Sequence, residues 1–308
     1  MRLNFLGQIT LRDLEFTQSF THAMVPTPVQ LSNGNLKLFF TSLDENGRGR
    51  PFSCHLNPKN PFEITSYSEI PILELGDAGT FDDSGIVVTS VIQGLGDSLL
   101  MYYVGFERCT DSRYRMLTGI AVSEDSGLTF KKIGKAPILE RTSDELYFRA
   151  GTFVLRDEDR FRMWYVGGSD WHAIDNKLFP TNNLKYLESN DGFKWTDKPN
   201  TQMIPNSDSE LGFGRPWVIM RDNFNFEMFY SIRNRKNGKY AMGFARSDDG
   251  GESWRRYDTE LGDNFDTKDG SEREYMYASV IKISGKFYMF YNGKNYGKEG
   301  IYVSELVN

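Results

Sequence analysis

The segments FRMWYVGG (residues 161–168) and LKYLESNDGFKW (residues 184–195) contain the pattern that repeats through this chain. The first is an apolar, aromatic strand. The second is another strand, followed by a Gly/Asp turn that ends in an aromatic residue. The core of the first segment, Arg162–Tyr165, has four related copies elsewhere. These copies are Leu100–Tyr103, Glu227–Tyr230, Tyr288–Tyr291 and, more loosely, Lys37–Phe40.

The copies recur at a regular interval. Their last aromatic residues stand at positions 40, 103, 165, 230 and 291, which are 63, 62, 65 and 61 residues apart. A regular long period with strand signals inside each copy is typical of a repeat architecture, and a propeller blade usually has about 40 to 50 residues. We therefore predict an all-β, five-bladed β-propeller in a single domain, with elaborated loops. A repeating pair of β-sandwiches is the alternative.

The period also predicts where each blade lies. We place the blades at roughly 22–65, 80–132, 147–197, 211–257 and 274–306. The last repeat contains only three clear strands, so the N-terminal stretch 3–9 is expected to supply the fourth and to close the ring. Closure matters because an open ring leaves sheet edges unpaired. A frayed N-terminal tail is the alternative.

Composition limits the partners of the chain. Charged residues make up 25% of the sequence and the net charge is −6, which argues against nucleic acid because a phosphate backbone binds a basic surface. No apolar run is long enough for a signal peptide or a membrane span, so no membrane partner is expected. The two cysteines, Cys54 and Cys109, do not make a disulfide framework. We therefore expect a cytoplasmic protein.

Candidate site residues lie directly before the innermost strand of each blade, where the chain reaches the central channel. The strongest signal is GTFDDSG (79–85), in which Asp82 and Asp83 are adjacent carboxylates between glycines. Neighbours in an extended segment point to opposite sides, so one is expected to face the channel and the other to cap the turn. His22 precedes the first inner strand, where a structural hydrogen bond is the alternative role.

The later blades carry acids, arginines and aromatic residues at the equivalent positions. These are Glu145, Tyr147 and Arg149 in the third blade, Arg215 and Trp217 in the fourth, and Glu272, Glu274, Tyr275 and Tyr277 in the fifth. Converging carboxylates suit glycosidic bond cleavage, in which one acid protonates the leaving oxygen and another carboxylate activates water or attacks. The aromatic rings would hold the sugar. The arginines would bind a carboxylate or phosphate on the substrate, or else pair with a channel acid.

Three turns share Ser, Asp, Gly and an aromatic residue. They are SEDSGLTF (123–130), SDDGGESW (247–254) and the shorter SNDGFKW (189–195). Asp and Ser side chains hydrogen-bond the N–H groups of such turns and Gly adopts positive φ, so we predict a structural role at outer hairpins. The turns resemble the Asp boxes of sialidases, but those propellers have six blades and the period here predicts five.

The segments HAMVPTP, GTFDDSG, MWY/MYY, SNDGFKW, GRP and FYNGKNYGK together resemble the five-bladed propeller superfamily of glycoside hydrolase families 43, 32 and 68. The chain looks most similar to stand-alone bacterial family-43-like or sucrase-like proteins, over nearly its whole length. The resemblance implies an Asp base in the first blade, a supporting Asp in the second and a Glu acid in the third. Asp82 or Asp83 and Glu145 match the last two, whereas the first blade has His22 and no acid. Glu272 or Glu274 would then supply the base.

Three functions are consistent with this pattern. The first is a glycoside hydrolase that acts on a small sugar or oligosaccharide, which is anionic if the arginines bind it. The second is a phosphorylase resembling family 130, in which phosphate replaces water and is cradled by His22, Arg149 and Arg215. The third is a noncatalytic glycan-binding propeller.

No cofactor is expected from the sequence. Some relatives hold a calcium ion in the channel, and His172 with Asp170 or Asp175 is a weak candidate for such a site. A solvated or substrate-covering loop that includes Trp171 is the better interpretation of this segment.

Overall fold

The computed structural model describes residues 1–10, 19–94, 96–157, 160–262 and 275–307. This part of the chain is nearly all β, with two four-residue helices, α1 (Thr259–Gly262) and α2 (Lys294–Gly297). Neither helix has the length or the apolar character needed to cross a membrane. The strands, in chain order, are β1 (Arg2–Ile9), β2 (Thr21–Gln30), β3 (Leu36–Leu43), β4 (Gly49–Asn57), β5 (Asn60–Tyr67), β6 (Ile86–Gln93), β7 (Leu99–Arg108), β8 (Tyr114–Ser123), β9 (Lys131–Lys132), β10 (Phe148–Asp157), β11 (Arg160–Ile174), β12 (Lys177–Ser189), β13 (Asn200–Met203), β14 (Glu210–Met220), β15 (Phe226–Asn234), β16 (Tyr240–Ser247), β17 (Arg255–Arg256), β18 (Met276–Ile283), β19 (Lys286–Asn292) and β20 (Ile301–Val307).

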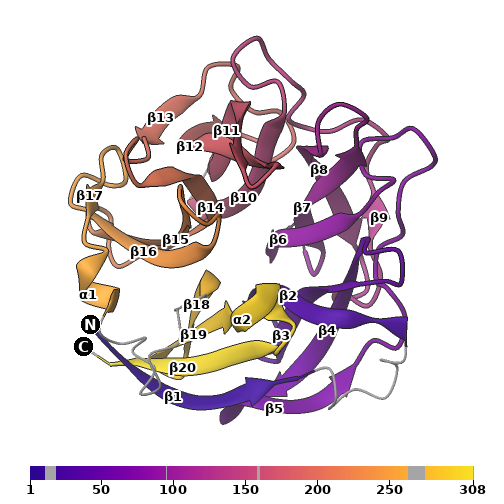
Figure 1. Cartoon of the computed structure of the whole chain (residues 1–308). Helices are drawn as coiled ribbons and strands as arrows, with labels where there is room; N and C mark the ends of the chain where they lie inside the picture. Colours follow the sequence, from indigo (N-terminus) through magenta and orange to yellow (C-terminus); the bar gives the residue numbers. More distant parts are fainter. Residues whose placement is uncertain (11–18, 95, 158–159, 263–274, 308) are drawn as a thin grey trace.

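The described strands form antiparallel groups of four. Three groups are separate sheets, with the strand orders β2-β3-β4-β5, β14-β15-β16-β17 and β1-β20-β19-β18. The groups β6–β9 and β10–β13 are joined into one eight-stranded sheet by a short parallel pairing of β8 with β10. Figure 1 shows the groups around a common centre, with β2, β6, β10, β14 and β18 innermost. The architecture is propeller-like.

The first and last strands of the chain meet in one sheet. β1 pairs antiparallel with β20, from Arg2 opposite Val307 to Ile9 opposite Ile301. β1 is therefore the outer strand of the group that also contains β18, β19 and β20 (Figure 1). Because β20 is hydrogen-bonded on both sides, it leaves no open edge for pairing with another chain.

The repeated aromatic strands bury both of their faces. In β11, Met163 and Tyr165 belong to one hydrophobic cluster, whereas Trp164 belongs to another that includes Trp217 of β14. Successive side chains of a strand point to opposite faces, so a strand with consecutive buried residues lies in a sheet covered on both sides. Burying one such aromatic side chain contributes about 1.5–3 kcal/mol. The repeated motif thus explains why each sheet packs between neighbours.

Each innermost strand has a bulge at an equivalent place. The register with the second strand shifts between Met24 and Thr27, Val88 and Ser90, Ala150 and Phe153, Gly214 and Trp217, and Met276 and Ser279. A bulge takes residues out of the ladder and re-aims their side chains. Val25 and Tyr277 lie in two of these bulges with φ of 53° and 57°. Residues other than glycine rarely adopt a positive φ, and those that do are concentrated at functional sites.

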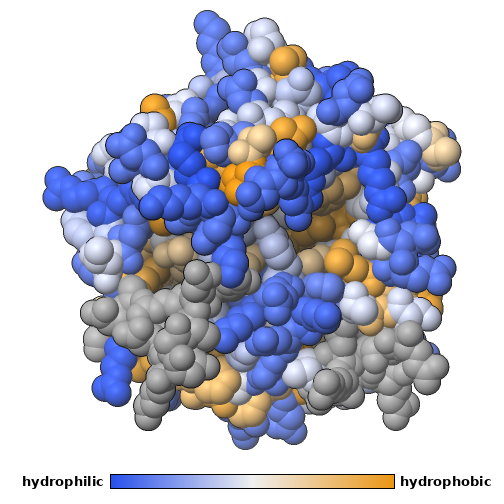
Figure 2. Space-filling model, in the orientation of Figure 1, coloured by the Kyte–Doolittle hydropathy of each residue, from blue (hydrophilic) through white to orange (hydrophobic). Residues whose placement is uncertain are grey.

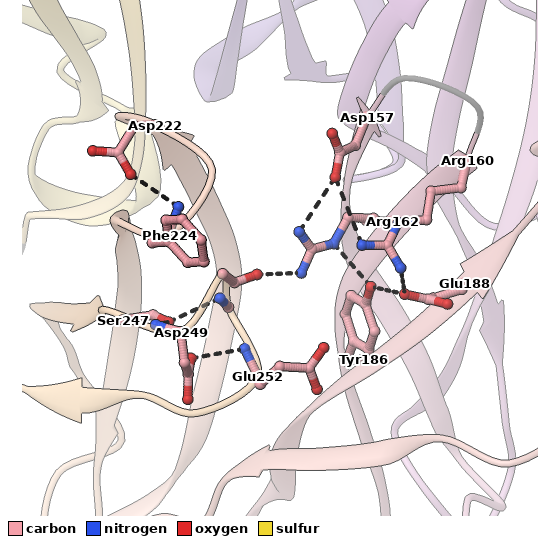
Figure 3. A network of polar contacts seen from close by, with 12 residues as sticks. Asp157, Arg160, Arg162, Tyr186, Glu188, Asp222, Phe224, Ser247, Asp249 and Glu252 are labelled. Carbon is pink, nitrogen blue, oxygen red and sulfur yellow. Dashed lines mark hydrogen bonds and ion pairs between the residues drawn. The ribbon is translucent and has the colours of Figure 1, made fainter.

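The three Ser/Asp/Gly turns lie at the outer hairpins, and Figure 3 shows the one at 247–254. Ser247 Oγ donates to Asp249 Oδ1 at 2.6 Å and accepts from the Gly251 N–H at 2.8 Å. The turns 123–130 and 189–195 repeat these bonds. None of the Ser or Asp side chains of these turns lines the central cavity described below. Their hydrogen bonds are those expected of structural turns.

Each of these turns is also bonded to the preceding group of strands. A side chain on the second strand of that group donates a hydrogen bond to a carbonyl at the glycine of the turn. The donor and acceptor pairs are Lys37 with Gly127 O (2.8 Å), Tyr102 with Gly192 O (2.9 Å) and Arg162 with Gly250 O (2.6 Å). Figure 3 shows that Arg162 also contacts Asp157 and Tyr186. We call these three turns with their donors the rim clasps.

Candidate functional site

A cavity of about 630 Å³ lies at the centre of the molecule. Its lining includes one bulge residue from each of the innermost strands, namely Val25, Thr89, Gly151, Arg215 and Tyr277. Figure 2 shows apolar surface in the hollowed centre of this face, surrounded by hydrophilic residues. The bulges therefore bring residues from all five groups of strands to one place.

Arg215 ties the innermost strands together at this cavity. Its Nη1 donates to Pro26 O, Thr27 Oγ1 and Thr89 O at 3.0–3.2 Å. Its Nη2 donates to the carbonyls of Tyr277 and Ala278 and to Ser279 Oγ at 2.6–3.1 Å. Burial lowers the pKa of this fully buried guanidinium to about 9, so it remains charged near pH 7. Arg215 was predicted to bind substrate, but most of its hydrogen-bonding capacity is used within the protein.

One wall of the cavity is formed by Arg233 and aromatic rings. Arg233 Nη2 donates to the Tyr240 hydroxyl at 2.6 Å, and Nη1 donates to the Tyr296 hydroxyl at 3.3 Å and to Gly238 O at 2.9 Å. Its guanidinium carbon lies 4.1 Å from the centre of the Tyr240 ring and 5.4 Å from that of Phe179. Arg233, Tyr240, Tyr296 and Phe179 were not predicted from the sequence.

A signal for this wall is present in the sequence. The strand that carries each aromatic motif continues toward the cavity. In three of the groups, the third residue after the motif lines the cavity. These residues are Leu43 after Phe40, Phe106 after Tyr103, and Arg233 after Tyr230. Counting from the motif would have identified Arg233, whereas counting from the innermost strands does not.

Among the described residues, the charged side chains that line the cavity are all cationic. Arg108, Arg113 and Lys177 are exposed and line it together with the buried Arg215 and Arg233. Among the described lining residues there is no Asp or Glu. This charge pattern differs from the converging carboxylates that the sequence led us to expect.

The second-group acids are bonded elsewhere. Asp82 is buried and accepts a hydrogen bond from the Tyr103 hydroxyl at 2.9 Å, with Lys132 Nζ at 2.6 Å. Asp83 accepts from the Gly79 N–H at 2.8 Å and from the Ser84 hydroxyl at 2.7 Å. Asp83 thus caps the turn, while Asp82 lies inside the sheet group rather than in the described cavity lining. A catalytic role for either one stays a prediction.

Glu145 has a similar environment in the next group. This buried carboxylate lies 2.9 Å from Arg149 Nε and 3.3 Å from Lys185 Nζ, and it accepts from the Tyr165 hydroxyl at 3.0 Å. Tyr165 occupies the motif position that Tyr103 occupies beside Asp82. The motif tyrosine therefore holds a carboxylate paired with a cation in two neighbouring groups. Arg149 pairs with an acid, which was the alternative to substrate binding.

The remaining candidates are dispersed. Glu272 and Glu274 lie outside the described residues. The other side chains are absent from the lining of the central cavity: His22, Tyr147, Trp217 and Tyr275. Of the twelve residues proposed from the sequence as catalytic or substrate-binding, the structure brings Arg215 and Tyr277 together in the cavity lining.

Trp217, Tyr275 and His22 have other neighbours. Trp217 is buried and donates from Nε1 to Val280 O at 2.8 Å, and Tyr275 packs against Tyr291 with ring centres 5.4 Å apart. His22 Nδ1 lies 2.9 Å from Thr21 Oγ1. Burial, followed by nearby Lys298, lowers the pKa of His22, so the ring is neutral near pH 7. The predicted phosphate cradle of His22, Arg149 and Arg215 is therefore not assembled in the cavity lining.

A second pocket of about 580 Å³ adjoins the central cavity, and Arg108 and Cys109 line both. Tyr147 and Trp171 line the second pocket, with ring centres 6.1 Å apart. Trp171 also packs edge-on against Phe148. Trp171 lies in β11 rather than in a loop, and its ring lies beside an opening next to the cavity, so a ligand-covering role for it stays a prediction.

The described residues contain no cluster of three or more His, Cys, Asp or Glu side chains suited to a metal ion. His172 Nδ1 lies 3.3 Å from a guanidinium nitrogen of Arg235, which is a poor neighbour for a cation site. Calcium requires several oxygen ligands, usually including carboxylates. The part of the cavity lining that the structure describes does not offer such a set.

Comparison with known proteins identifies the fold. A scan against protein-family models finds no match. The protein named Uncharacterized protein Rv1502, from Mycobacterium tuberculosis (strain ATCC 25618 / H37Rv), is 25% identical over 303 residues, which cover 98% of either sequence. A thermostable family-43 glycoside hydrolase is similar with a TM-score of 0.66 at 17% identity, covering 94% of this chain and 90% of that chain. The α-L-arabinofuranosidase from Lactobacillus brevis is similar with a TM-score of 0.68 at 13% identity, covering 97% and 94%.

The resemblance inferred from the sequence is thus confirmed for the fold. The chain has the propeller-like, all-β architecture of the family-43 glycoside hydrolase structures over nearly its whole length. One fold hosts many activities, so the activity has to be argued from the site.

Proposed function

We propose that this protein binds a small sugar or oligosaccharide in its central cavity. The observation that carries the proposal is the cavity itself, with its volume of about 630 Å³ and with Phe106, Phe179 and Tyr277 among its lining residues. Ligand pockets usually have about 300–1,000 Å³, and aromatic faces combine a large contact area with polar edges that suit sugar rings. The similarity to glycoside hydrolase structures supports a carbohydrate ligand.

We further propose that the groups of strands are the five blades of a closed propeller. The equivalent bulges in β2, β6, β10, β14 and β18 support one repeating blade plan. The pairing of β1 with β20 and the bonds from Arg215 to residues of β2, β6 and β18 support closure. The single-domain boundaries predicted above belong to the same proposal.

Glycoside hydrolysis is the second candidate function, favoured by the similarity to family-43 enzymes. Two-carboxylate cleavage requires acids at the bound sugar. Glu272 and Glu274 stand four and two residues before the first residue of β18, whose Tyr277 lines the cavity, so we assign them as the acids to test first. Asp82, Asp83 and Glu145 are the next to test. A noncatalytic glycan-binding protein needs none of these acids.

The cytoplasm remains the proposed location. Cys54 and Cys109 are free cysteines, which suits a reducing compartment.

Calorimetric titration of the full chain with a panel of neutral and acidic sugars tests the binding proposal. Phe179→Ala is expected to weaken binding about tenfold, because losing one aromatic contact costs about 1.5 kcal/mol or more. Phe193→Ala, an exposed aromatic substitution in a rim turn, is the control and should leave the affinity unchanged. The proposal is wrong if no sugar binds, or if both variants behave alike.

Turnover of aryl glycosides, with and without inorganic phosphate, then separates the candidate activities. Hydrolysis that disappears in Glu272→Gln or Glu274→Gln would establish the hydrolase. Turnover only with phosphate would favour the phosphorylase. Sugar binding without any turnover would favour the noncatalytic protein.

A further inference from the structure

Arg215 and Arg233 are buried cations with no carboxylate partner among the described residues. Other buried arginines have such a partner, as the pairs Arg149–Glu145 and Arg162–Asp157 show. Among the described residues, the hydrogen bonds of Arg215 and Arg233 all go to carbonyl and hydroxyl oxygens. Both residues line the central cavity. The cavity therefore holds buried positive charge without a counter-charge from the residues that the structure describes.

This arrangement is energetically costly unless an anion joins it. An unpaired buried charge costs several kcal/mol even after relaxation, and hydrogen bonds to neutral oxygens offset only part of this cost. Arg108, Arg113 and Lys177 add three more positive charges to the same cavity. Because the whole chain has a net charge of −6, this concentration of cations does not follow from composition. It favours binding of a negatively charged ligand.

The tyrosines around Arg233 do not supply the missing charge. Burial raises the pKa of Tyr114, Tyr277 and Tyr296, so these phenols are neutral near pH 7. Tyr296 and Tyr240 accept hydrogen bonds from Arg233. A phenol that accepts a bond keeps its own O–H for donation. The wall therefore combines a guanidinium with hydroxyl groups, which suits an acidic group on a hydroxylated ligand.

Arg113 and Arg233 converge on one aromatic ring. Their guanidinium carbons lie 5.7 and 5.4 Å from the ring centre of Phe179. Arg113 directly precedes β8, whereas Arg233 lies in β15 of another sheet. Guanidinium groups bind carboxylates and phosphates through two parallel, charge-assisted hydrogen bonds. Two such groups beside one ring can hold an acidic group next to a stacked sugar.

We propose that Arg113 and Arg233 bind the carboxylate or phosphate group of an acidic sugar whose ring contacts Phe179 in the central cavity. This inference rests on the proposed sugar-binding function and names its ligand class. Arg215 contributes long-range positive charge while it holds the innermost strands together. The acidic group supplies the counter-charge that the described residues do not, and the neutral part of the sugar faces the aromatic wall.

The test is calorimetric titration of the full chain with three matched sets of probes. These are neutral hexoses, the corresponding hexuronates and the corresponding hexose phosphates. At least one acidic probe is expected to bind about tenfold or more tightly than its neutral counterpart, because a hydrogen bond to a charged group is worth about 1.5–3 kcal/mol. Raising the salt concentration should weaken acidic-probe binding selectively. A preference for uronates or for phosphates identifies the acidic group.

Arg113→Gln tests the assigned residue without a large folding risk, because Arg113 is exposed. It should reduce the affinity for the acidic probe about tenfold and reduce neutral binding much less. Arg160→Gln, which removes an arginine that is about half exposed and belongs to a surface ion pair, is the matched control. Arg233→Lys keeps the charge but removes the planar fork, and should also weaken acidic binding.

Equal binding of neutral and acidic probes would overturn this inference and leave the sugar-binding function standing. Tight acidic binding that Arg113→Gln does not change would overturn the assignment of the residue. Failure of every sugar to bind would overturn both proposals.

Discussion

The rim clasps and the central cavity are built from the same repeated unit, but the residues are alike from repeat to repeat at the rim and differ at the centre. At the rim, three turns keep the same side chains, and Ser and Asp make the same hydrogen bonds each time. At the centre, the equivalent bulges carry five different residues, Val25, Thr89, Gly151, Arg215 and Tyr277. The rim uses repetition to join neighbouring groups of strands, whereas the centre uses differences between repeats to build an asymmetric site.

The difference has an energetic basis. A rim turn satisfies its own N–H groups locally, so the same residues serve in every repeat. The centre has to fill one shared space with side chains from all the groups, and five copies of a large residue would collide there. Arg215 fills the role of a central bridge once, and Gly151 opposite it has no side chain.

The largest effect is expected from Arg215→Met. The substitution removes a buried guanidinium that bonds six oxygens on residues of three other strands, and each buried acceptor left without a partner costs about 1–3 kcal/mol. We expect a loss of about 5 kcal/mol or more in the free energy of unfolding, measured by urea denaturation. Arg156→Met on an exposed part of an innermost strand is the control. A loss below 1 kcal/mol would contradict the role of Arg215 as the central bridge.

Glu145→Gln should have the next largest effect. It leaves the buried Arg149 and the nearby Lys185 without their carboxylate, which typically costs about 3–5 kcal/mol. Glu140→Gln, at an exposed glutamate, should be nearly neutral. The catalytic turnover of Glu145→Gln should also be measured on any substrate that the glycoside panel identifies. Loss of activity with unchanged stability would show that Glu145 is the catalytic acid and not a structural charge.

Arg162→Met tests the rim with the same chemical change as at Arg215. It removes the bond to Gly250 O and those to Tyr186 and Asp157, while the carbonyl of the turn lies near solvent. We expect a smaller loss of about 1–3 kcal/mol, again from urea denaturation. If this loss equalled or exceeded that of Arg215→Met, the contrast between centre and rim would fail.

Asp249→Asn should have the smallest effect, and it should depend on pH. Hydrogen bonds from Ser247, Ser253 and their neighbours lower the pKa of Asp249 to about 2. A carboxylate with a depressed pKa in the folded state stabilises the fold above its unfolded pKa of about 3.9 and loses this contribution as the pH falls toward 2. The thermal midpoint of the wild type should therefore fall more steeply than that of Asp249→Asn between pH 4 and pH 2. Parallel curves would argue against a contribution from this rim turn.

Several features of the fold could be read directly from the sequence. The period of the aromatic motif, the strand content and the structural role of the Ser/Asp/Gly turns all depend on local patterns. The N-terminal strand was expected beside the last repeat, and β1 pairs with β20. These features can be predicted from local strand and turn propensity and from the number of strands in each repeat.

The direction of each site residue could not be read in the same way. Moving a strand by one residue turns every side chain to the other face, and the bulges introduce such shifts in each innermost strand. Asp82 and Glu145 precede the innermost strands, so strand alternation does not set their direction, and they lie against the motif tyrosines rather than in the described cavity lining. Arg233 was missed because it lies on the second strand of its group, three residues after the aromatic motif, whereas candidates were sought only before the innermost strands.

The sequence by itself determined the repeating strands, the rim turns and the chemical types available near the centre, because these depend on local patterns of side chains. The tertiary structure alone decided that buried acids pair with cations inside the groups while Arg113, Arg215 and Arg233 line the cavity. The physical reason is that charge pairing and bulge geometry depend on contacts between distant segments, and neither is encoded in the spacing of one segment.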